Sequence, residues 1–223
     1  MERFPQRERQ ASSALAVRVS AIVVVRAAHV SGQSPLELCL RGALSEPWID
    51  ELVIVDSGCS PAVAKELRAL QADRRDVKLV VCDAGWSAGD AANAGAASAS
   101  GRWLLFLDQH VVLRRGAVER MVAAGGGAPE PWIVGGRLSD PMGRERARAR
   151  TAPLTTWSAF ALALNLNGAR ARRIGDEAAP VSAVSNDFML LARTDFEDLG
   201  GFDGRFATHG ADLDLCRRAA DAG

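Results

Sequence analysis

The chain has 223 residues, of which 48% are hydrophobic and 24% are charged, and this composition is typical of one substantial globular domain. Basic and acidic residues balance at 27 each, so the charge gives no indication of a nucleic-acid partner. No stretch approaches the about 18 consecutive apolar residues of a transmembrane helix, and the N-terminus lacks the apolar core of a signal peptide.

Residues 1–17 carry several charges and no long apolar run, and we interpret them as a mobile arm before a single domain over residues 18–223. The arm is mildly basic and rich in alanine, which leaves a peripheral contact with a membrane open. The four cysteines form no C-x-x-C pair, and three of them lie in or beside apolar runs. Reduced, buried thiols are the simplest interpretation, and they indicate a cytoplasmic protein.

Four short apolar runs in the first half of the chain predict β-strands. They are continuous instead of alternating, which is typical of strands buried on both faces of a parallel sheet. The runs cover residues 19–25, 51–56, 77–83 and 102–108.

Segments with helical patterns lie between these runs. The first has Leu36, Leu40 and Ala43 on one face, and the second opens with Pro61. A third, over residues 87–100, is rich in small residues and can therefore pack very close to the sheet or to a ligand. The alternation of strand and helix predicts an α/β fold with a mostly parallel central sheet and helices on both faces.

The second half of the chain is less regular. A turn-rich break at residues 125–132 precedes a predicted strand at residues 132–138. Residues 139–180 are rich in proline and arginine, and we interpret them as a mobile functional loop.

Regular structure is predicted again from residue 183. Residues 183–193 are mostly apolar, and Thr194 and Glu197 have the spacing of a capping box for a short helix that ends at Gly200-Gly201. Residues 211–223 predict a final helix.

Aspartates follow three of the predicted strands, at Asp56, Asp83 and Asp108. In an open parallel sheet, ligands bind beyond the carboxyl ends of the strands, so three acids along this edge indicate a binding site. The alternative for each is a structural role, because aspartate after a strand commonly caps the next helix.

Asp108 and His110 form a second pattern within this edge. Residues two apart on an extended chain point to the same side, so the carboxylate and the imidazole can converge. Oxygen and nitrogen ligands suit a divalent ion of the Mn²⁺ type, which would bridge the two phosphates of a nucleotide diphosphate. A simple Asp–His hydrogen bond in a turn is the alternative.

The order of the motifs resembles that of the inverting glycosyltransferases of family 2, which have the GT-A fold. The resemblance rests on VSAIVVV (19–25), ELVIVDSGCS (51–60), AANAGAASASGRWLLFLDQH (91–110) and the stretch from FMLLARTDFEDLGGFDGRF to the C-terminus (188–223). Within the family, the sequence looks most like bacterial transferases that add rhamnose or related sugars to lipid-linked or polysaccharide acceptors of the cell envelope.

The resemblance implies specific roles. Asp56 would contact the donor base, Asp108 and His110 would hold Mn²⁺ or Mg²⁺ and the donor diphosphate, and Asp212 would be the general base that deprotonates the acceptor hydroxyl. Arg26, Asp83 and Asn93 complete the predicted donor-nucleotide set. Residues 139–180 would lie on the acceptor side, where a glycan or a lipid-linked acceptor binds.

The sequence also departs from the family pattern. His110 replaces the last aspartate of Asp-x-Asp, Ser57 replaces the second aspartate after the second strand, and Ala211 replaces the glutamate before Asp212. The usual donor loop after the first strand is absent at Arg26-Ala27. Family members also continue beyond Gly223, so a shortened C-terminus is expected.

Three alternatives to an active transferase follow from the residues. A dinucleotide-dependent dehydrogenase would need G-x-G-x-x-G after the first strand, where the chain reads RAAHVSG. A metallophosphoesterase would need more histidine ligands than the three in the chain. The third alternative, a non-catalytic GT-A domain that binds a nucleotide or a partner protein, remains open.

Overall fold

The computed structural model describes residues 19–26, 34–83, 85–126, 130–140, 142–143, 150–151, 178–181, 183–206 and 209–223. The predicted arm at residues 1–17 and most of the predicted loop at residues 139–180 lie outside them. Among the described residues, no helix is both long and apolar enough to cross a membrane.

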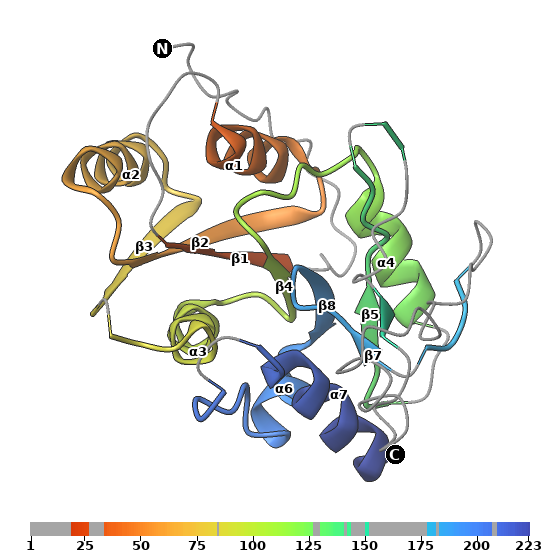
Figure 1. The fold of residues 1–223 in the computed structure, drawn as a ribbon. Coiled ribbons are helices and arrows are strands. Elements are labelled where there is room, and N and C mark those ends of the chain that lie inside the picture. Colours follow the sequence, from red (N-terminus) through yellow and green to blue (C-terminus); the bar gives the residue numbers. More distant parts are fainter. Residues whose placement is uncertain are drawn as a thin grey trace.

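Six strands form the central sheet, in the order β3-β2-β1-β4-β8-β5 (Figure 1). Strands β1 to β4 run parallel, and β8 lies antiparallel between β4 and β5. The predicted, mostly parallel sheet is confirmed: the runs of β1, β2 and β4 are largely buried on both faces, whereas β3 lies at the edge and is only partly buried. The strands are β1 Val19–Val25, β2 Ile49–Ser57, β3 Val77–Cys82, β4 Trp103–Leu107, β5 Ile133–Gly135 and β8 Phe188–Ala192.

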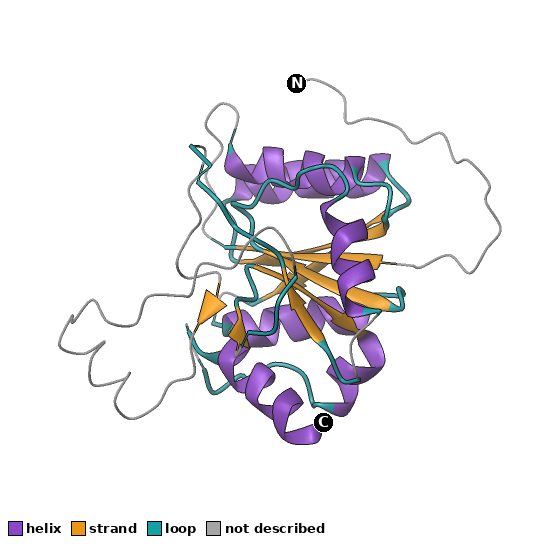
Figure 2. Cartoon of the chain, turned by 90° about the vertical axis from the view of Figure 1, so that its right-hand side faces the viewer, coloured by secondary structure: helices purple, strands orange, loops and turns teal. Residues whose placement is uncertain are grey.

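Helices cover both faces of the sheet (Figure 2). On one face, the core includes residues of α1 Pro35–Ser45, α2 Pro61–Asp73 and α4 Ala117–Gly125. On the other face, it includes residues of α3 Ala88–Ser98, α6 Arg193–Asp198 and α7 Ala211–Ala222. A small separate sheet pairs β6 Arg150–Thr151 with β7 Ala183–Val184.

Serine side chains begin the first three helices. Ser34, Ser60 and Ser87 each accept a hydrogen bond from the backbone N–H three residues later, at 3.2, 3.4 and 2.9 Å. At Ser87, Asp90 completes a capping box. The predicted starts of the second and third helices are therefore confirmed.

The predicted capping box at Thr194 is wrong. Helix α6 begins at Arg193, directly after β8, and no side chain caps it. The backbone N–H of Arg193 donates to Arg102 O, and its guanidinium donates to Ala99 O, both at 2.9 Å. These tertiary contacts, which local spacing does not reveal, set the start of the helix.

Two other elements differ from the predictions. Helix α4 was not predicted, since it follows Gly116 in the left-handed region (φ 73°) and has no side-chain cap to signal its start. The strand predicted at residues 132–138 is shorter, because β5 covers only Ile133–Gly135.

Helix α3 lies very close to the sheet, as its small residues predicted. A Cβ added at Gly95 would be 2.6 Å from Ile22 Cγ2 and 2.8 Å from Val55 Cγ2, both buried in the sheet. Only a glycine at this position lets the backbone of α3 come this close to the sheet. The helix therefore has one well-defined packing position on β1 and β2.

Gly95→Val is expected to destabilise the fold by about 1–3 kcal/mol, because the added side chain overlaps two buried methyl groups. Urea unfolding followed by circular dichroism measures this change. The control is Gly85→Val, since a Cβ added at Gly85 meets no atom within 4 Å. A control that unfolds as easily as Gly95→Val would contradict the packing argument.

Candidate functional site

None of the three strand-end aspartates caps a helix. The helices that follow β2 and β3 are capped by Ser60 and Ser87, and the next helix after β4 begins after Gly116. The structural alternative for these acids as helix caps is therefore excluded, and their common place is the carboxyl edge of the parallel strands.

Asp56, the second-last residue of β2, is a buried carboxylate with 5% of its surface exposed. Its Oδ1 accepts a hydrogen bond from the Cys59 backbone N–H at 2.9 Å, which closes the turn after the strand. The Cys59 thiol in turn donates to Val25 O at 3.4 Å. Burial, followed by the nearby Asp56 carboxylate, raises the pKa of Cys59 to about 12, so this thiol stays neutral and unreactive.

Arg26 connects three segments at this edge. The Gln109 side chain accepts from the Arg26 N–H at 3.2 Å and donates to Arg26 O at 3.1 Å, which joins the ends of β1 and β4. The Arg26 guanidinium donates to Trp86 O at 2.7 Å, in the loop that precedes α3. Asp83 begins this loop as an exposed residue, and its backbone oxygen accepts from Trp86 N at 3.1 Å.

Asp108 and His110 lie together after β4, but they do so in a turn closed by a hydrogen bond from Val111 N–H to Asp108 O at 2.9 Å, and not on the extended chain that the prediction assumed. Asp108 Oδ1 accepts from the His110 backbone N–H at 2.8 Å and lies 2.9 Å from His110 Nδ1. Both side chains reach solvent, with 40% and 60% exposed. The hydrogen bond that was the alternative to a metal site therefore exists in the structure.

The two side chains also fit a divalent ion. Asp108 offers a carboxylate oxygen and His110 a ring nitrogen, and these ligand types suit an ion such as Mn²⁺. Within the described part of the chain, no group of three or more His, Cys, Asp or Glu side chains is placed to hold a metal. Asp108 and His110 can thus supply two ligands and leave the remaining positions to a substrate or water.

The turn at residues 185–187 joins Asp108 to Asp212. Asp187 O accepts from the Asp108 N–H at 2.9 Å, and the Asn186 N–H donates to Asp212 Oδ2 at 3.4 Å. Asp212 Oδ1 accepts from the Leu213 N–H at 2.9 Å. Asp212 lies in the first turn of α7 but is not its cap, which is Gly210. This turn was not predicted, although its three polar residues between two apolar stretches are a signal for it.

Asn93 has a different environment from the one predicted. Its amide nitrogen donates to Phe202 O at 2.7 Å, and its amide oxygen accepts from Phe202 N at 2.9 Å. Both ends of the side chain are thus bound to the backbone of a neighbouring loop, and we assign Asn93 to that loop instead of to a donor nucleotide.

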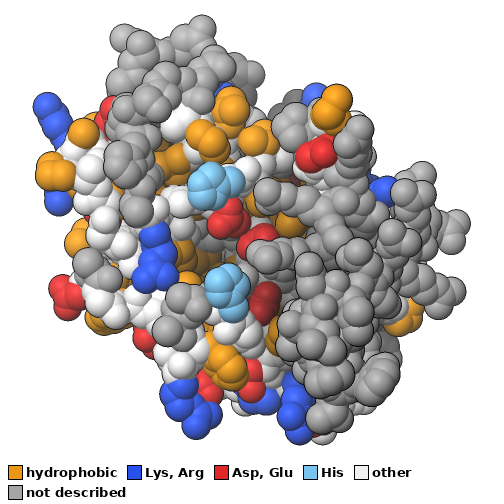
Figure 3. Space-filling view, viewed as in Figure 1, with side chains coloured by type: hydrophobic (Ala, Val, Ile, Leu, Met, Phe, Trp, Pro, Cys, Tyr) orange, Lys and Arg blue, Asp and Glu red, His pale blue; other side chains and the backbone are white. Residues whose placement is uncertain are grey.

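One face of the molecule carries these polar side chains. Figure 3 shows histidine side chains next to acidic ones in the middle of this face, around a hollow. Asp108, His110 and Asp212 are each at least partly accessible to solvent. A ligand in the hollow can therefore contact carboxylates and an imidazole together.

The family model described as Glycosyl transferase family 2 matches residues 20–200. A comparison with curated protein sequences gives no significant match. Three solved structures share the fold at low identity. GalNAc-T7, solved with UDP, GalNAc and Mn²⁺, has a TM-score of 0.64 and 17% identity, over 94% of this chain and 41% of its own.

The other two structures are a mannosyltransferase and TarS. PcManGT from Pyrobaculum calidifontis, in complex with GDP-Man and Mn²⁺, has a TM-score of 0.55 and 18% identity, over 88% of this chain and 49% of its own. S. aureus TarS 1–349 has a TM-score of 0.56 and 14% identity, over 91% and 55%. The chain thus spans about half the length of the solved chains it matches. Its fold is that of these GT-A structures, and by the family match the chain belongs to glycosyl transferase family 2.

Proposed function

We propose that the chain transfers a sugar from a nucleotide-diphosphate-sugar donor to a hydroxyl acceptor, with inversion at the anomeric carbon. One observation carries this proposal: a single turn, residues 185–187, bonds to the backbone of Asp108 and to the carboxylate of Asp212. A candidate diphosphate-side ligand and a candidate base thus share one end of the sheet. Direct displacement requires these two functions on either side of the reacting carbon.

On the donor side, we assign base and phosphate contacts to the strand edge. The buried Asp56 carboxylate suits an N–H group of the donor base, and Arg26 and the exposed Asp83 lie at neighbouring strand ends. Arg26 supplies positive charge for an anionic donor. The nucleotides and Mn²⁺ in the GalNAc-T7 and PcManGT structures support a nucleotide-sugar donor and a divalent metal here also.

Asp108 and His110 are the residues that would hold Mn²⁺ or Mg²⁺. When bound, the metal supplies positive charge that neutralises the diphosphate leaving group. Gln109 supports the pair, since its side chain fixes the segment to the end of β1 through two hydrogen bonds with Arg26.

Asp212 is the proposed general base. Its carboxylate accepts the proton of the acceptor hydroxyl while the hydroxyl oxygen attacks the anomeric carbon. The N–H groups of Asn186 and Leu213 orient the two carboxylate oxygens. Ala211 leaves this carboxylate without the glutamate neighbour that the family pattern has.

For the acceptor, we propose a glycan or a sugar of a lipid-linked molecule. Phe206 is 37% exposed and lies against Gly210, two residues before Asp212. An exposed aromatic ring at the start of the helix that carries the base suits stacking on a sugar ring. Rhamnose is the transferred sugar that the sequence resemblance favours, and a single domain over residues 18–223 carries the site in this proposal.

The second candidate function is nucleotide binding without transfer. The direct hydrogen bond between Asp108 and His110, together with alanine at position 211, favours it. Binding and turnover experiments separate the two functions.

Mn²⁺ is expected to strengthen binding of UDP, dTDP or GDP, because the ion neutralises charge between the diphosphate and Asp108. His110→Ala and Asp108→Asn should each weaken the metal-dependent binding by about tenfold or more, as measured by calorimetry with and without Mn²⁺. The control is Val112→Ala, an exposed residue of the same loop. Nucleotide affinity that is the same with and without Mn²⁺ would rule out the metal site.

Asp212→Asn is expected to lower the rate of sugar transfer by about 10²–10⁴-fold, because the amide cannot accept the hydroxyl proton. Donor affinity should stay unchanged, since the amide keeps the shape of the carboxylate. The rate is measured with radiolabelled donor and a panel of glycan and lipid-linked acceptors. Asp221→Asn, at the exposed end of the same helix, is the matched control. Nucleotide binding by the unaltered protein without any donor hydrolysis or transfer would favour the second candidate.

A further inference from the structure

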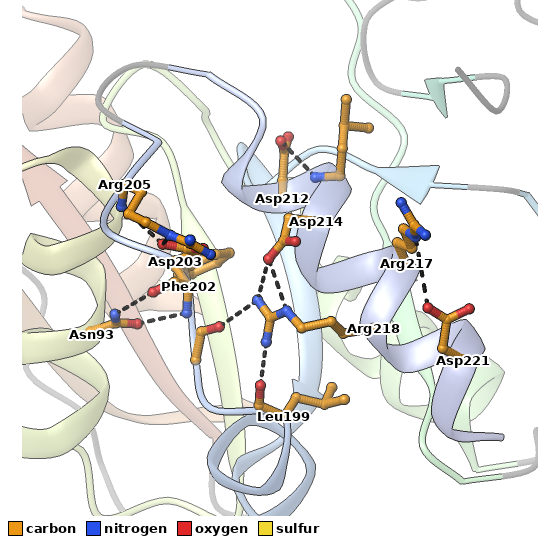
Figure 4. Close-up of polar contacts among 12 residues, drawn as sticks. Asn93, Leu199, Phe202, Asp203, Arg205, Asp212, Asp214, Arg217, Arg218 and Asp221 are labelled. Atoms are coloured by element: carbon orange, nitrogen blue, oxygen red, sulfur yellow. Dashed lines mark hydrogen bonds and ion pairs between the residues drawn. The ribbon is translucent and has the colours of Figure 1, made fainter. Parts of the chain in front are cut away.

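Residues 199–206, the first part of the connection between α6 and α7, are held by side chains from two different helices (Figure 4). We call this segment the return loop, since it leads the chain back to the site. From α3, Asn93 forms two hydrogen bonds to the Phe202 backbone, at 2.7 and 2.9 Å. The side-chain amide thus pairs with Phe202 as a neighbouring β-strand would. It binds both the backbone N–H and the carbonyl group of this residue.

From α7, Arg218 holds the other side of the return loop. Its guanidinium donates to Leu199 O and, at 2.8 Å, to Gly201 O. Asp214, one turn earlier on the same helix, accepts from Arg218 Nε at 2.8 Å and pairs with its Nη2 at 2.7 Å. The ion pair orients the guanidinium plane, so the planar fork reaches two carbonyls together.

Packing makes the return loop a rigid link between the two helices. The Phe202 side chain is 2% exposed, and its ring contacts Phe106 and Phe196 at centroid distances of 4.8 and 5.3 Å. A Cβ at Gly204 would lie 2.1 Å from Asp90 Oδ1, which shows how closely the loop follows α3. Because α3 packs closely against β1 and β2, the position of the return loop is fixed relative to the sheet.

Helix α7 is held by its buried face, including Leu215, but its start has no side-chain cap, so its tilt also depends on this link. Its cap is Gly210 in the left-handed region (φ 101°), and no side chain caps the first turn, where Asp212 lies. Arg218 follows Asp212 by six residues, or about 9 Å along a helix. A tilt of α7 about a loosened Arg218 therefore displaces the Asp212 carboxylate.

We propose that Asn93 and Arg218 are positioning residues, which fix the Asp212 carboxylate relative to the donor-side helix α3 through the return loop. This inference rests on the proposed function, in which Asp212 is the base. Because a misplacement of about 1 Å can cost a reaction about 10²-fold, such a link has a direct effect on the chemical step. Neither residue is proposed to contact the substrate.

The chain offers a matched control for Arg218. Arg217 is the adjacent residue on α7, and its side chain is 82% exposed, with an ion pair to Asp221 at 3.7 Å. Arg217→Met and Arg218→Met make the same chemical change, but only the second removes the contacts with the return loop. Arg218→Lys is the conservative variant, since one ammonium group can bind one of the two carbonyls.

The first measurement is hydrogen exchange of the backbone amides, which needs no activity. Arg218→Met and Asn93→Ala are expected to raise exchange about tenfold or more in residues 199–214, whereas Arg217→Met should match the unaltered protein. Arg218→Lys should give an intermediate value. Equal exchange in the two methionine variants would overturn the proposal, as would a uniform increase over the whole molecule, which is simple destabilisation.

The second measurement compares transfer kinetics with donor affinity. Arg218→Met should lower kcat by about 10–10²-fold at unchanged donor affinity. In the Asp212→Asn background the same change should have little further effect, because the base it positions is already lost. Independent, multiplicative losses in the double variant would refute a role through Asp212. If the unaltered protein neither binds nor transfers a sugar donor, the proposed function fails, and the exchange comparison alone then decides whether the loop holds α7.

Discussion

The antiparallel placement of β8 beside β4 is the constraint on which the rest of the site depends. Phe188 pairs with Leu107, so the first residue of β8 lies next to the last residue of β4. The turn before β8 therefore reaches the carboxyl ends of the parallel strands, where ligands bind in open α/β sheets. From there its backbone can bond both to Asp108 and to Asp212, which come from distant parts of the chain.

The same strand direction determines the path that follows. Ala192, the last residue of β8, pairs with Trp103 at the opposite end of β4, so α6 begins at the edge away from the site. The chain must then return to the carboxyl edge of the parallel strands, where Asp212 lies. It does so along α3, in an irregular segment that lacks a strand partner, and side chains of Asn93 and Arg218 satisfy backbone groups that a sheet would otherwise pair.

Charge is the second organising factor at this edge. Asp56 and Asp108 each accept a hydrogen bond from a backbone N–H of the turn that follows their strand, which stabilises the two carboxylates at this edge. An anionic diphosphate would still be repelled by these acids. Arg26 and a divalent ion at Asp108 and His110 supply the opposite charge, so the proposed donor site is electrostatically complete only with both.

Much of the fold follows from local features of the sequence. The four parallel strands were predicted to within two residues from their continuous apolar runs, and Pro61 and the small residues from position 87 marked two of the helices. The closeness of Asp108 and His110 was predicted from their spacing, although a turn, and not an extended chain, brings them together. Helix α4 was not, because its glycine start carries no side-chain signal.

The amino-acid sequence by itself thus determined the layered α/β architecture, the row of aspartates at the strand ends and the family resemblance, all of which depend on residues close together in the chain. Only the tertiary structure decided that the turn at 185–187 joins Asp108 to Asp212, and that Asn93 binds a loop 109 residues away. These contacts depend on the antiparallel direction of β8 in the sheet and on the close packing of α3 against it. Neither property has a local signature in the sequence.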